Sequence, residues 1–174
     1  MVMVLFSRVA PCALVVAMVI GLLGGCGESR SIFGGCTARD EQLSTTLAGL
    51  PILKAHPVSA EPTTQISGCD TDDGFAFAEH EYHTELDRQD VIAFYRKAAT
   101  DDGWLPDGEN PAPPTDGLVI TAAVACFLKL VDGTTVHFKV WFPSDLRIPG
   151  ELGPTTLGDY GVGVTGSHDG TAWC

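Results

Sequence analysis

The strongest constraint on the fold is a pair of apolar stretches, residues 118–131 and 134–142, separated only by Asp132-Gly133. A tight two-residue turn needs a positive φ at both positions, which glycine adopts at little cost and aspartate tolerates. In the second stretch apolar and more polar side chains alternate, which is typical of a strand with one buried face. The pattern predicts an antiparallel hairpin. Its core positions are Val136, Phe138, Val140 and Phe142, and its outward positions are Thr135, His137, Lys139 and Trp141.

Residues 87–102 carry the clearest helical pattern in the chain. Asp87 is a favourable N-cap residue, and Asp90 in the first turn suits the positive end of the helix dipole. Apolar residues then recur at the spacing i, i+3, i+4, i+7, and Gly103 can close the helix in a left-handed conformation. The sequence therefore predicts an amphipathic helix. Its apolar stripe comprises Val91, Phe94, Tyr95 and Ala98.

Other segments have shorter patterns. Residues 38–50 place leucines on one helical face, residues 74–83 alternate as a strand, and residues 160–165 alternate as a last strand. Residues 54–73 and 105–117 are rich in proline, glycine and acidic side chains, which is typical of loops.

Together these elements predict an α+β fold. We expect a short antiparallel sheet of about four strands, with the main helix of residues 87–102 packed on one face. A second helix precedes them near the N-terminus. The length of the chain suits one such domain.

The first 25 residues have a different character from the rest. Residues 9–23 form an apolar run that is too short to span a bilayer comfortably and is typical of a secretory signal peptide. The run ends in Leu23-Gly24-Gly25-Cys26, which resembles a bacterial lipobox. The resemblance implies cleavage before Cys26 and a diacylglycerol thioether on its sulfur. Acylation, including palmitate, would then hold the protein on the extracytoplasmic face of the cell membrane.

Two other interpretations of this segment remain open. One is a plain signal peptide cut near the same place, and the other is a signal anchor that is never cut. On the lipoprotein interpretation, residues 1–25 are the signal peptide and residues 26–35 are a flexible tether rich in glycine and serine. Residues 36–174 then form the single α+β domain.

Cysteine usage fits an exported protein. Once Cys12 is assigned to the signal peptide and Cys26 to lipid, four cysteines remain: Cys36, Cys69, Cys126 and Cys174. An even number in an oxidising compartment predicts two disulfide bonds. Three connectivities are open, and we prefer Cys36–Cys69 with Cys126–Cys174, since the latter would pin the last residue to a central strand. Zinc binding by these thiols is disfavoured because no two lie close together in the sequence.

Several short segments together resemble a group of small, largely uncharacterised actinobacterial cell-surface lipoproteins. They are residues 91–96 with Gly103-Trp104, residues 126–129, residues 140–142 and residues 172–174. In that group a helix with an FY…GW pattern precedes short antiparallel strands. The resemblance implies a surface lipoprotein without an established activity, and it implies that Phe94, Tyr95 and Trp104 are packing residues.

Residues 79–83 form the densest set of potential metal ligands. In a strand, Glu79, Glu81 and His83 would share one face and His80 the other, so at most one histidine joins the two carboxylates. Zinc would need a partner from elsewhere, for which His137 is the candidate. The favoured interpretation is the solvated half of a strand in an acidic protein.

Two further patterns are weaker. Asp70 and Asp72 begin a segment like a calcium loop, but Gly74 lies one position too early for an EF-hand, which favours an acidic turn. Ser167-His168-Asp169 are adjacent in sequence, which is typical of a turn and not of a catalytic triad assembled in space.

Charge restricts the class of partner. Residues 26–174 hold 9 basic and 22 acidic side chains, which gives a net charge of −13. This charge excludes a protein that binds nucleic acid by neutralising phosphates.

We expect a non-enzymatic, lipid-anchored binding or structural protein whose partner is a protein or an envelope component, with no cofactor. The sequence leaves the oligomeric state open. The alternative is a metal- or calcium-dependent envelope enzyme that uses the cluster from Glu79 to His83.

Overall fold

The computed structural model describes residues 35–109, 123–145, 158–170 and 172–174, all within a compact unit of residues 31–174. The predicted signal peptide, the lipobox cysteine Cys26 and nearly all of the tether lie outside the described residues. So do residues 110–117 of the predicted loop and residues 118–122 of the first predicted hairpin stretch. The helices are α1 (Ala38–Ala48), α2 (Pro51–Lys54), α3 (Arg88–Asp101) and the 3-10 turn η1 (Pro143–Asp145). The strands are β1 (Glu61–Cys69), β2 (Ala76–His83), β3 (Leu105–Glu109), β4 (Ala123–Val131), β5 (Thr134–Trp141) and β6 (Asp159–Gly166).

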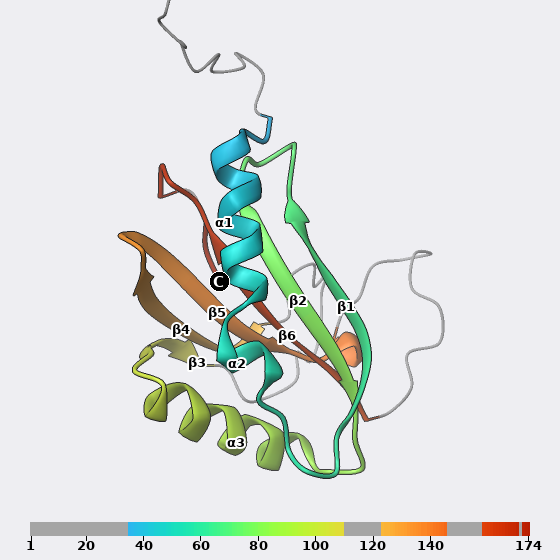
Figure 1. The fold of residues 1–174 in the computed structure, drawn as a ribbon. Coiled ribbons are helices and arrows are strands. Elements are labelled where there is room, and N and C mark those ends of the chain that lie inside the picture. The colour runs from blue at the N-terminus through green and yellow to red at the C-terminus, as the bar shows by residue number, and fades with distance from the viewer. Residues whose placement is uncertain (1–34, 110–122, 146–157, 171) are drawn as a thin grey trace, which may run out of the picture. The chain divides into compact units, whose positions relative to one another are not determined.

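The strands form one antiparallel sheet of six strands in the order β1-β2-β6-β5-β4-β3 (Figure 1). The expectation of about four strands with one main helix is therefore wrong. The sheet has an additional strand at each edge, and α1 packs on three of its strands, whereas α3 packs on one. β6, the last strand in sequence, lies near the middle, between β2 and β5.

Both unexpected strands lie in segments that were predicted to be loops. β1 is exposed at Glu61–Ser67 and has no alternating pattern, because neither of its faces is deeply buried. β3 contains a proline and a glycine, and its pairing with β4 shifts register between Pro106 and Gly108. Such residues are tolerated at sheet edges and bulges, so the composition of a loop is compatible with an edge strand.

The predicted hairpin is confirmed. Its two strands are β4 and β5, and Asp132 and Gly133 have φ values of 48° and 82°. The predicted division of faces also holds, because Val136, Phe138 and Val140 are completely buried. Local turn chemistry and alternation thus agree with the tertiary structure here.

The helices begin and end close to the predicted residues. α1 begins with a capping box in which the Thr37 and Asp40 side chains bond to each other's backbone N–H. α3 is followed by Gly103 at φ 79°, and Trp104 then folds back into the core with its backbone N–H donating to the Ala99 carbonyl at 2.9 Å. No helix in the described ranges is long and apolar enough to cross a membrane.

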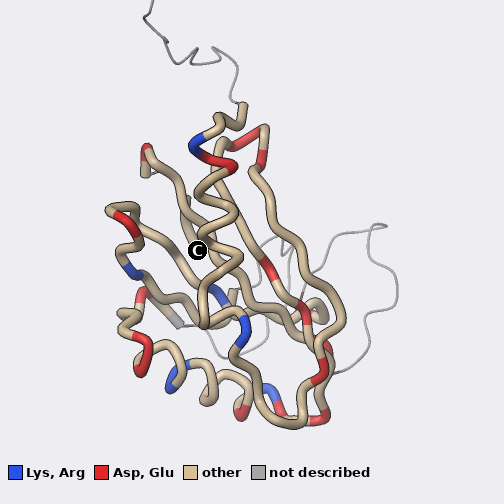
Figure 2. The backbone as a smooth tube through the Cα atoms, viewed as in Figure 1, with Lys and Arg blue, Asp and Glu red and all other residues tan. Residues whose placement is uncertain are grey.

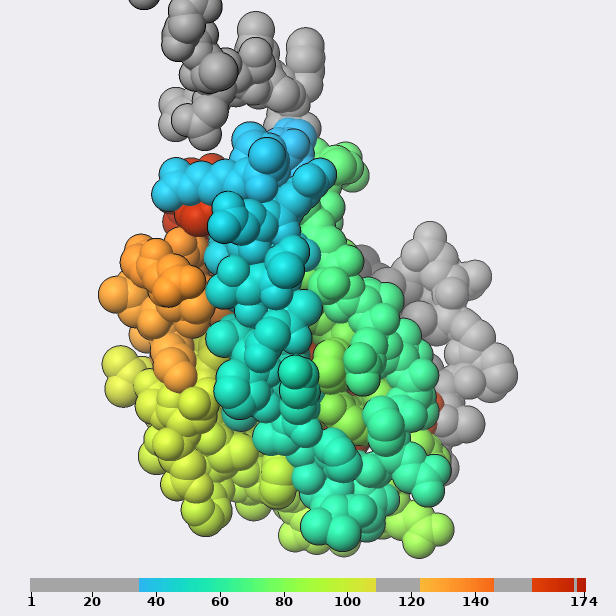
Figure 3. Space-filling model, in the orientation of Figure 1, coloured from blue at the N-terminus to red at the C-terminus, as the bar shows by residue number. Residues whose placement is uncertain are grey.

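The hydrophobic core lies between the helices and one face of the sheet. α1 packs on β1, β2 and β6, whereas α3 packs against β4. In Figure 3 the residues of α1 and α2 run down the middle of the molecule, between the hairpin and β1. Leu47, Leu53, Val91 and Val162 are among the core residues with no exposed surface.

The four remaining cysteines form two disulfide bonds, Cys36–Cys69 and Cys126–Cys174, each with a Cα–Cα distance of 5.9 Å. This is the preferred connectivity of the three. The first bond joins the entry to α1 to the end of β1, and the second joins β4 to residues 172–174. Each therefore ties a terminal segment of the domain to the sheet.

Candidate functional site

The candidate site is the face of the sheet opposite the helices, which we call the open face. Strand register places its residues in rows that cross the sheet. One row runs through Ile66, Glu79, Gly163, Lys139 and Cys126. A second runs through Thr64, Glu81, Gly161 and Trp141, and a third through Gly68, Phe77, Thr165 and His137.

Glycines in the central strand shape the middle of this face. Because Gly163 has no side chain, Lys139 of β5 and Glu79 of β2 meet across it with an Nζ–Oε1 distance of 2.8 Å. Gly161 lies under the indole of Trp141, and a Cβ at this position would lie 2.2 Å from the ring. The two glycines therefore allow large side chains of the neighbouring strands to lie flat over β6.

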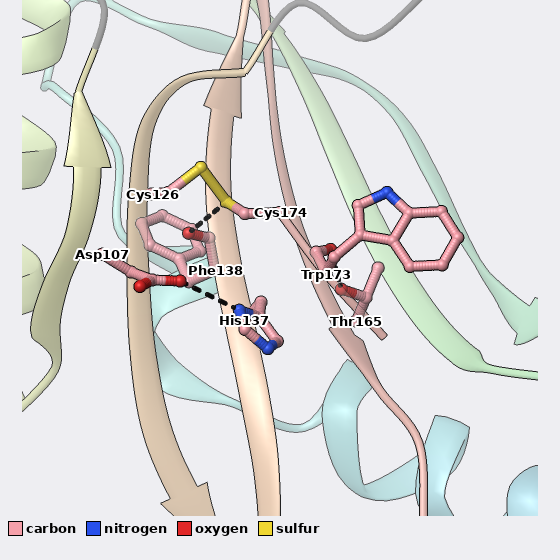
Figure 4. A network of polar contacts seen from close by, with 7 residues as sticks. All are labelled: Asp107, Cys126, His137, Phe138, Thr165, Trp173 and Cys174. Carbon is pink, nitrogen blue, oxygen red and sulfur yellow. Dashed lines mark hydrogen bonds and ion pairs between the residues drawn. A yellow bond between two sulfur atoms is a disulfide. The ribbon is translucent and has the colours of Figure 1, made fainter. Parts of the chain in front are cut away.

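Residues 172–174 lie across the same face (Figure 4). The Thr165 hydroxyl donates to the Trp173 carbonyl at 3.0 Å, and the Cys126–Cys174 bond holds the segment next to β5. Trp173 is 56% exposed, and its ring meets Phe75 edge to face at a centroid distance of 6.1 Å. The open face thus presents an exposed aromatic side chain beside fixed charged groups.

Polar pairs fix the rest of the face. His137 Nδ1 lies 3.4 Å from Asp107 Oδ2 (Figure 4). His83 Nδ1 lies 2.8 Å from Asp159 Oδ1. Asp107 belongs to β3 and Asp159 to β6, so each pair links two different strands. Such a surface suits polar and aromatic contacts to a partner.

The structure separates the predicted metal ligands of β2. Glu79, Glu81 and His83 lie on the open face, whereas His80 points into the core and is 7% exposed. This confirms the division between faces. Within the described parts of the chain, no group of three histidine, cysteine or acidic side chains is placed to hold a metal ion.

The acidic segment from Asp70 to Gly74 is a turn, as favoured from the sequence. Asp70 Oδ1 accepts hydrogen bonds from the backbone N–H groups of Asp72 and Asp73, at 2.8 and 3.2 Å. The Asp70 carboxylate therefore caps its own turn, and Gly74 completes it at φ 71°.

The serine, histidine and aspartate at 167–169 also form a turn. The Ser167 hydroxyl donates to the Asp169 carboxylate, whereas the His168 ring lies beside the Thr134 hydroxyl with an Nδ1–Oγ1 distance of 3.2 Å. Gly170 closes the turn at φ 78°. The hydrogen bonds hold the three residues as a turn, as favoured from the sequence, and the His168 ring is directed to Thr134 of β5.

His80 belongs to a buried polar network on the core side. Its Nδ1 lies 3.3 Å from the Tyr82 hydroxyl, which donates to the Leu53 carbonyl at 2.6 Å. Tyr95 similarly donates to the Ala55 carbonyl at 2.8 Å, and its oxygen lies 3.4 Å from that of Tyr160. The network satisfies carbonyl groups at and after the end of α2, where the helix leaves them without partners.

Burial changes the pKa values in this network. It lowers the pKa of His80 from its ordinary value of 6.5, and the positive charge of Lys54 lowers it further, against a raising effect of the Leu53 backbone. Burial also raises the pKa of Tyr82 and Tyr95, and that of Tyr160 to about 12. All four side chains are therefore neutral at pH 7.

A pH dependence of stability follows from His80. Because the pKa of His80 is lower in the folded than in the unfolded chain, the unfolded state binds a proton more readily as the pH falls below about 6.5. We expect His80→Gln to lose less stability than the wild type between pH 7.5 and pH 5, measured by urea unfolding at each pH. Equal losses in the two proteins would contradict this assignment.

Sequence reasoning located part of this site. The alternation of β5 placed His137, Lys139 and Trp141 on one outward face, which the structure confirms. The sequence analysis did not identify Asp107, which lay in a predicted loop, and it did not identify Trp173 as an exposed residue of the open face. No local signal identifies either, because their neighbours come from distant parts of the chain.

Comparison of the chain with protein-family models, with curated proteins and with solved structures gives no match.

Proposed function

We propose that this protein is a non-enzymatic, lipid-anchored domain on the extracytoplasmic face of the bacterial cell membrane, where it binds a protein or envelope component. The observation that carries the proposal is the pair of disulfide bonds in a domain that begins ten residues after Cys26. Disulfide bonds persist in oxidising compartments outside the cytoplasm. Their presence directly after a lipobox-like sequence supports export followed by anchoring.

The distance between anchor and domain supports a location near the membrane. Nine residues, 27–35, separate Cys26 from Cys36. A fully extended chain spans at most about 3.3–3.6 Å per residue, so the tether reaches roughly 30 Å. Two or more acyl chains on Cys26 would hold this assembly stably, whereas one chain binds only marginally.

The open face is the surface that we assign to partner binding. It combines the exposed indole of Trp173 with the Lys139–Glu79 and His137–Asp107 pairs, whose geometry is set by the sheet. Aromatic side chains with nearby polar groups are enriched at binding surfaces. A partner with polar and flat apolar groups would match this surface.

The state of the histidines supports binding over metal chemistry. All five histidines of the sequence are described, and each has a polar contact with a different residue. These partners are the Pro57 carbonyl for His56, Tyr82 for His80, Asp159 for His83, Asp107 for His137 and Thr134 for His168. A metal-dependent enzyme using residues 79–83 would have to break the pairs of Glu79 with Lys139 and of His83 with Asp159.

The anchor is tested by changing Cys26→Ala in the full chain, expressed in a bacterial host that processes lipoproteins. We expect the variant to lose labelling by a palmitate analogue and to move from the membrane fraction to the medium, because the thioether can no longer form. The matched control is Cys12→Ala, which changes a cysteine of the apolar run and should leave labelling and retention unchanged. Membrane retention of the Cys26→Ala protein with undiminished labelling would refute the proposal.

A further inference from the structure

The two edges of the sheet differ in how well they are protected against pairing. β3, at one edge, has five residues, including Pro106, Asp107 and Glu109, and an irregular register with β4. β1, at the other edge, has nine residues and no charged side chain from Pro62 to Cys69. Short strands, prolines, charges and bulges are the usual protection of an edge. β3 carries all of them, whereas β1 has only Pro62 and one register shift, both near its first residue.

The outer side of β1 has no strand beside it within the described sheet, and its residues 61–67 are exposed. Its trace is uncharged along most of its length in Figure 2. An edge of this kind offers its backbone N–H and C=O groups to another extended strand.

We propose that β1 pairs antiparallel with β1 of a second copy of this chain, which joins two sheets into one of twelve strands. The pairing relates the copies by a two-fold axis, so each surface meets its own equivalent. In the register that places Gln65 opposite Gln65, the Ile66 side chain lies opposite Thr64 and Glu61 lies opposite Cys69. Side chains directly opposite each other in such a pair lie on the same face.

Charge favours a second copy as the occupant. The chain has a net charge of −12, so most contacts between two copies would bring acidic side chains together. Of the two described edges, β1 is the one where two copies can pair without placing like charges opposite each other, because Pro62–Cys69 are all uncharged. In the proposed register the two Glu61 residues lie at opposite ends of the paired strands, about eight residues or ~27 Å apart.

Apolar side chains on the open face support the same pairing. Ile66 is 50% exposed and lies at the edge in the row that contains Glu79. In the proposed register Ile66 of each copy lies opposite Thr64 of the other, so the two Ile66 side chains lie diagonally across the two-fold axis on the same face. Their contact removes exposed apolar surface from water.

The test uses the full chain purified in detergent, with its molar mass measured by sedimentation equilibrium. We expect a reversible dimer for the wild type and an increase of at least tenfold in the dissociation constant for Ile66→Lys, which places two lysines near the axis. The matched control is Leu130→Lys, because Leu130 is 69% exposed on β4 of the same face and the charge change is identical. The control should dimerise like the wild type.

A second measurement identifies the occupant in cells. A photo-crosslinking amino acid in place of Ser67 should yield a covalent dimer joined through two copies of β1. A monomeric wild type up to 100-fold above its cellular concentration, crosslinks only to another protein, or equal dimerisation of Ile66→Lys and Leu130→Lys would overturn the proposal. The pairing does not require the lipid, so the Cys26→Ala chain should dimerise as well. Loss of the anchor and loss of the dimer are therefore separable results.

Discussion

Asp145→Ala is expected to lower the free energy of unfolding by about 3–5 kcal/mol, the range measured when one partner of a buried ion pair is removed. Asp145 is 4% exposed at the end of η1, and Arg88 at the start of α3 approaches both of its oxygens. Arg88 Nη1 donates to Asp145 Oδ1 at 2.9 Å, and Arg88 Nη2 lies 2.6 Å from Asp145 Oδ2 as a second contact of the ion pair. Without the carboxylate, the guanidinium stays largely buried over the Phe142 ring, 4.3 Å from its centroid.

The measurement is urea unfolding of the wild type and the variant, with Asp101→Ala as the matched control. Asp101 pairs with Lys97, but the two side chains are 62% and 77% exposed, so its removal should cost under about 1 kcal/mol. Arg88→Met combined with Asp145→Ala should be less destabilised than the sum of the single variants, because no buried charge is left unpaired. Similar losses for Asp145→Ala and Asp101→Ala would show that the buried pair does not stabilise the fold.

Replacing Cys126 and Cys174 together with alanine is expected to lower the free energy of unfolding by about 4 kcal/mol. The bond closes a segment with a sequence separation of 48 residues, and the loss is the chain entropy that the bond removes from the unfolded state. The variant should also free residues 172–174 from the open face, which leaves the Thr165 hydroxyl without the Trp173 carbonyl. Urea unfolding measures the stability, and hydrogen exchange at residues 172–174 reports the release.

The matched control is the double replacement of Cys36 and Cys69 with alanine. That bond has a sequence separation of 33 residues, so the same expression again predicts a loss of about 4 kcal/mol. Exchange at residues 172–174 should remain slow in this variant, because the bond lies at the other end of the domain's sequence. Equally fast exchange in both variants would show that the Cys126–Cys174 bond does not hold the segment.

The elements that sequence reasoning recovered are those with a strong local pattern. The hairpin of β4 and β5, the helix α3 and the last strand β6 each combine a hydrophobic period with a turn or cap residue. β1 and β3 lack such a pattern, because one is exposed along most of its length and the other contains a bulge. Their conformation depends on pairing with β2 and β4, so the predicted sheet lacked these two edge strands.

The candidate site divides in the same way. Alternation alone placed Glu79, Glu81 and His83 on one face of β2 and His80 on the other. The partners of these side chains came only from the structure, because Glu79 meets Lys139, and His83 meets Asp159, across strands that are far apart in sequence. In the structure, therefore, Glu79 and His83 of the predicted metal cluster belong to separate ion pairs, and His80 lies in the core.

The sequence by itself determined the hairpin, the main helix, the acidic charge and an even number of cysteines for the domain, because each depends on neighbouring residues or on composition. Tertiary structure decided the central position of β6, the two edge strands and which disulfide connectivity of three is formed. These features depend on contacts between residues separated by tens of positions. Such contacts form only when the whole sheet is assembled, and no local pattern encodes them.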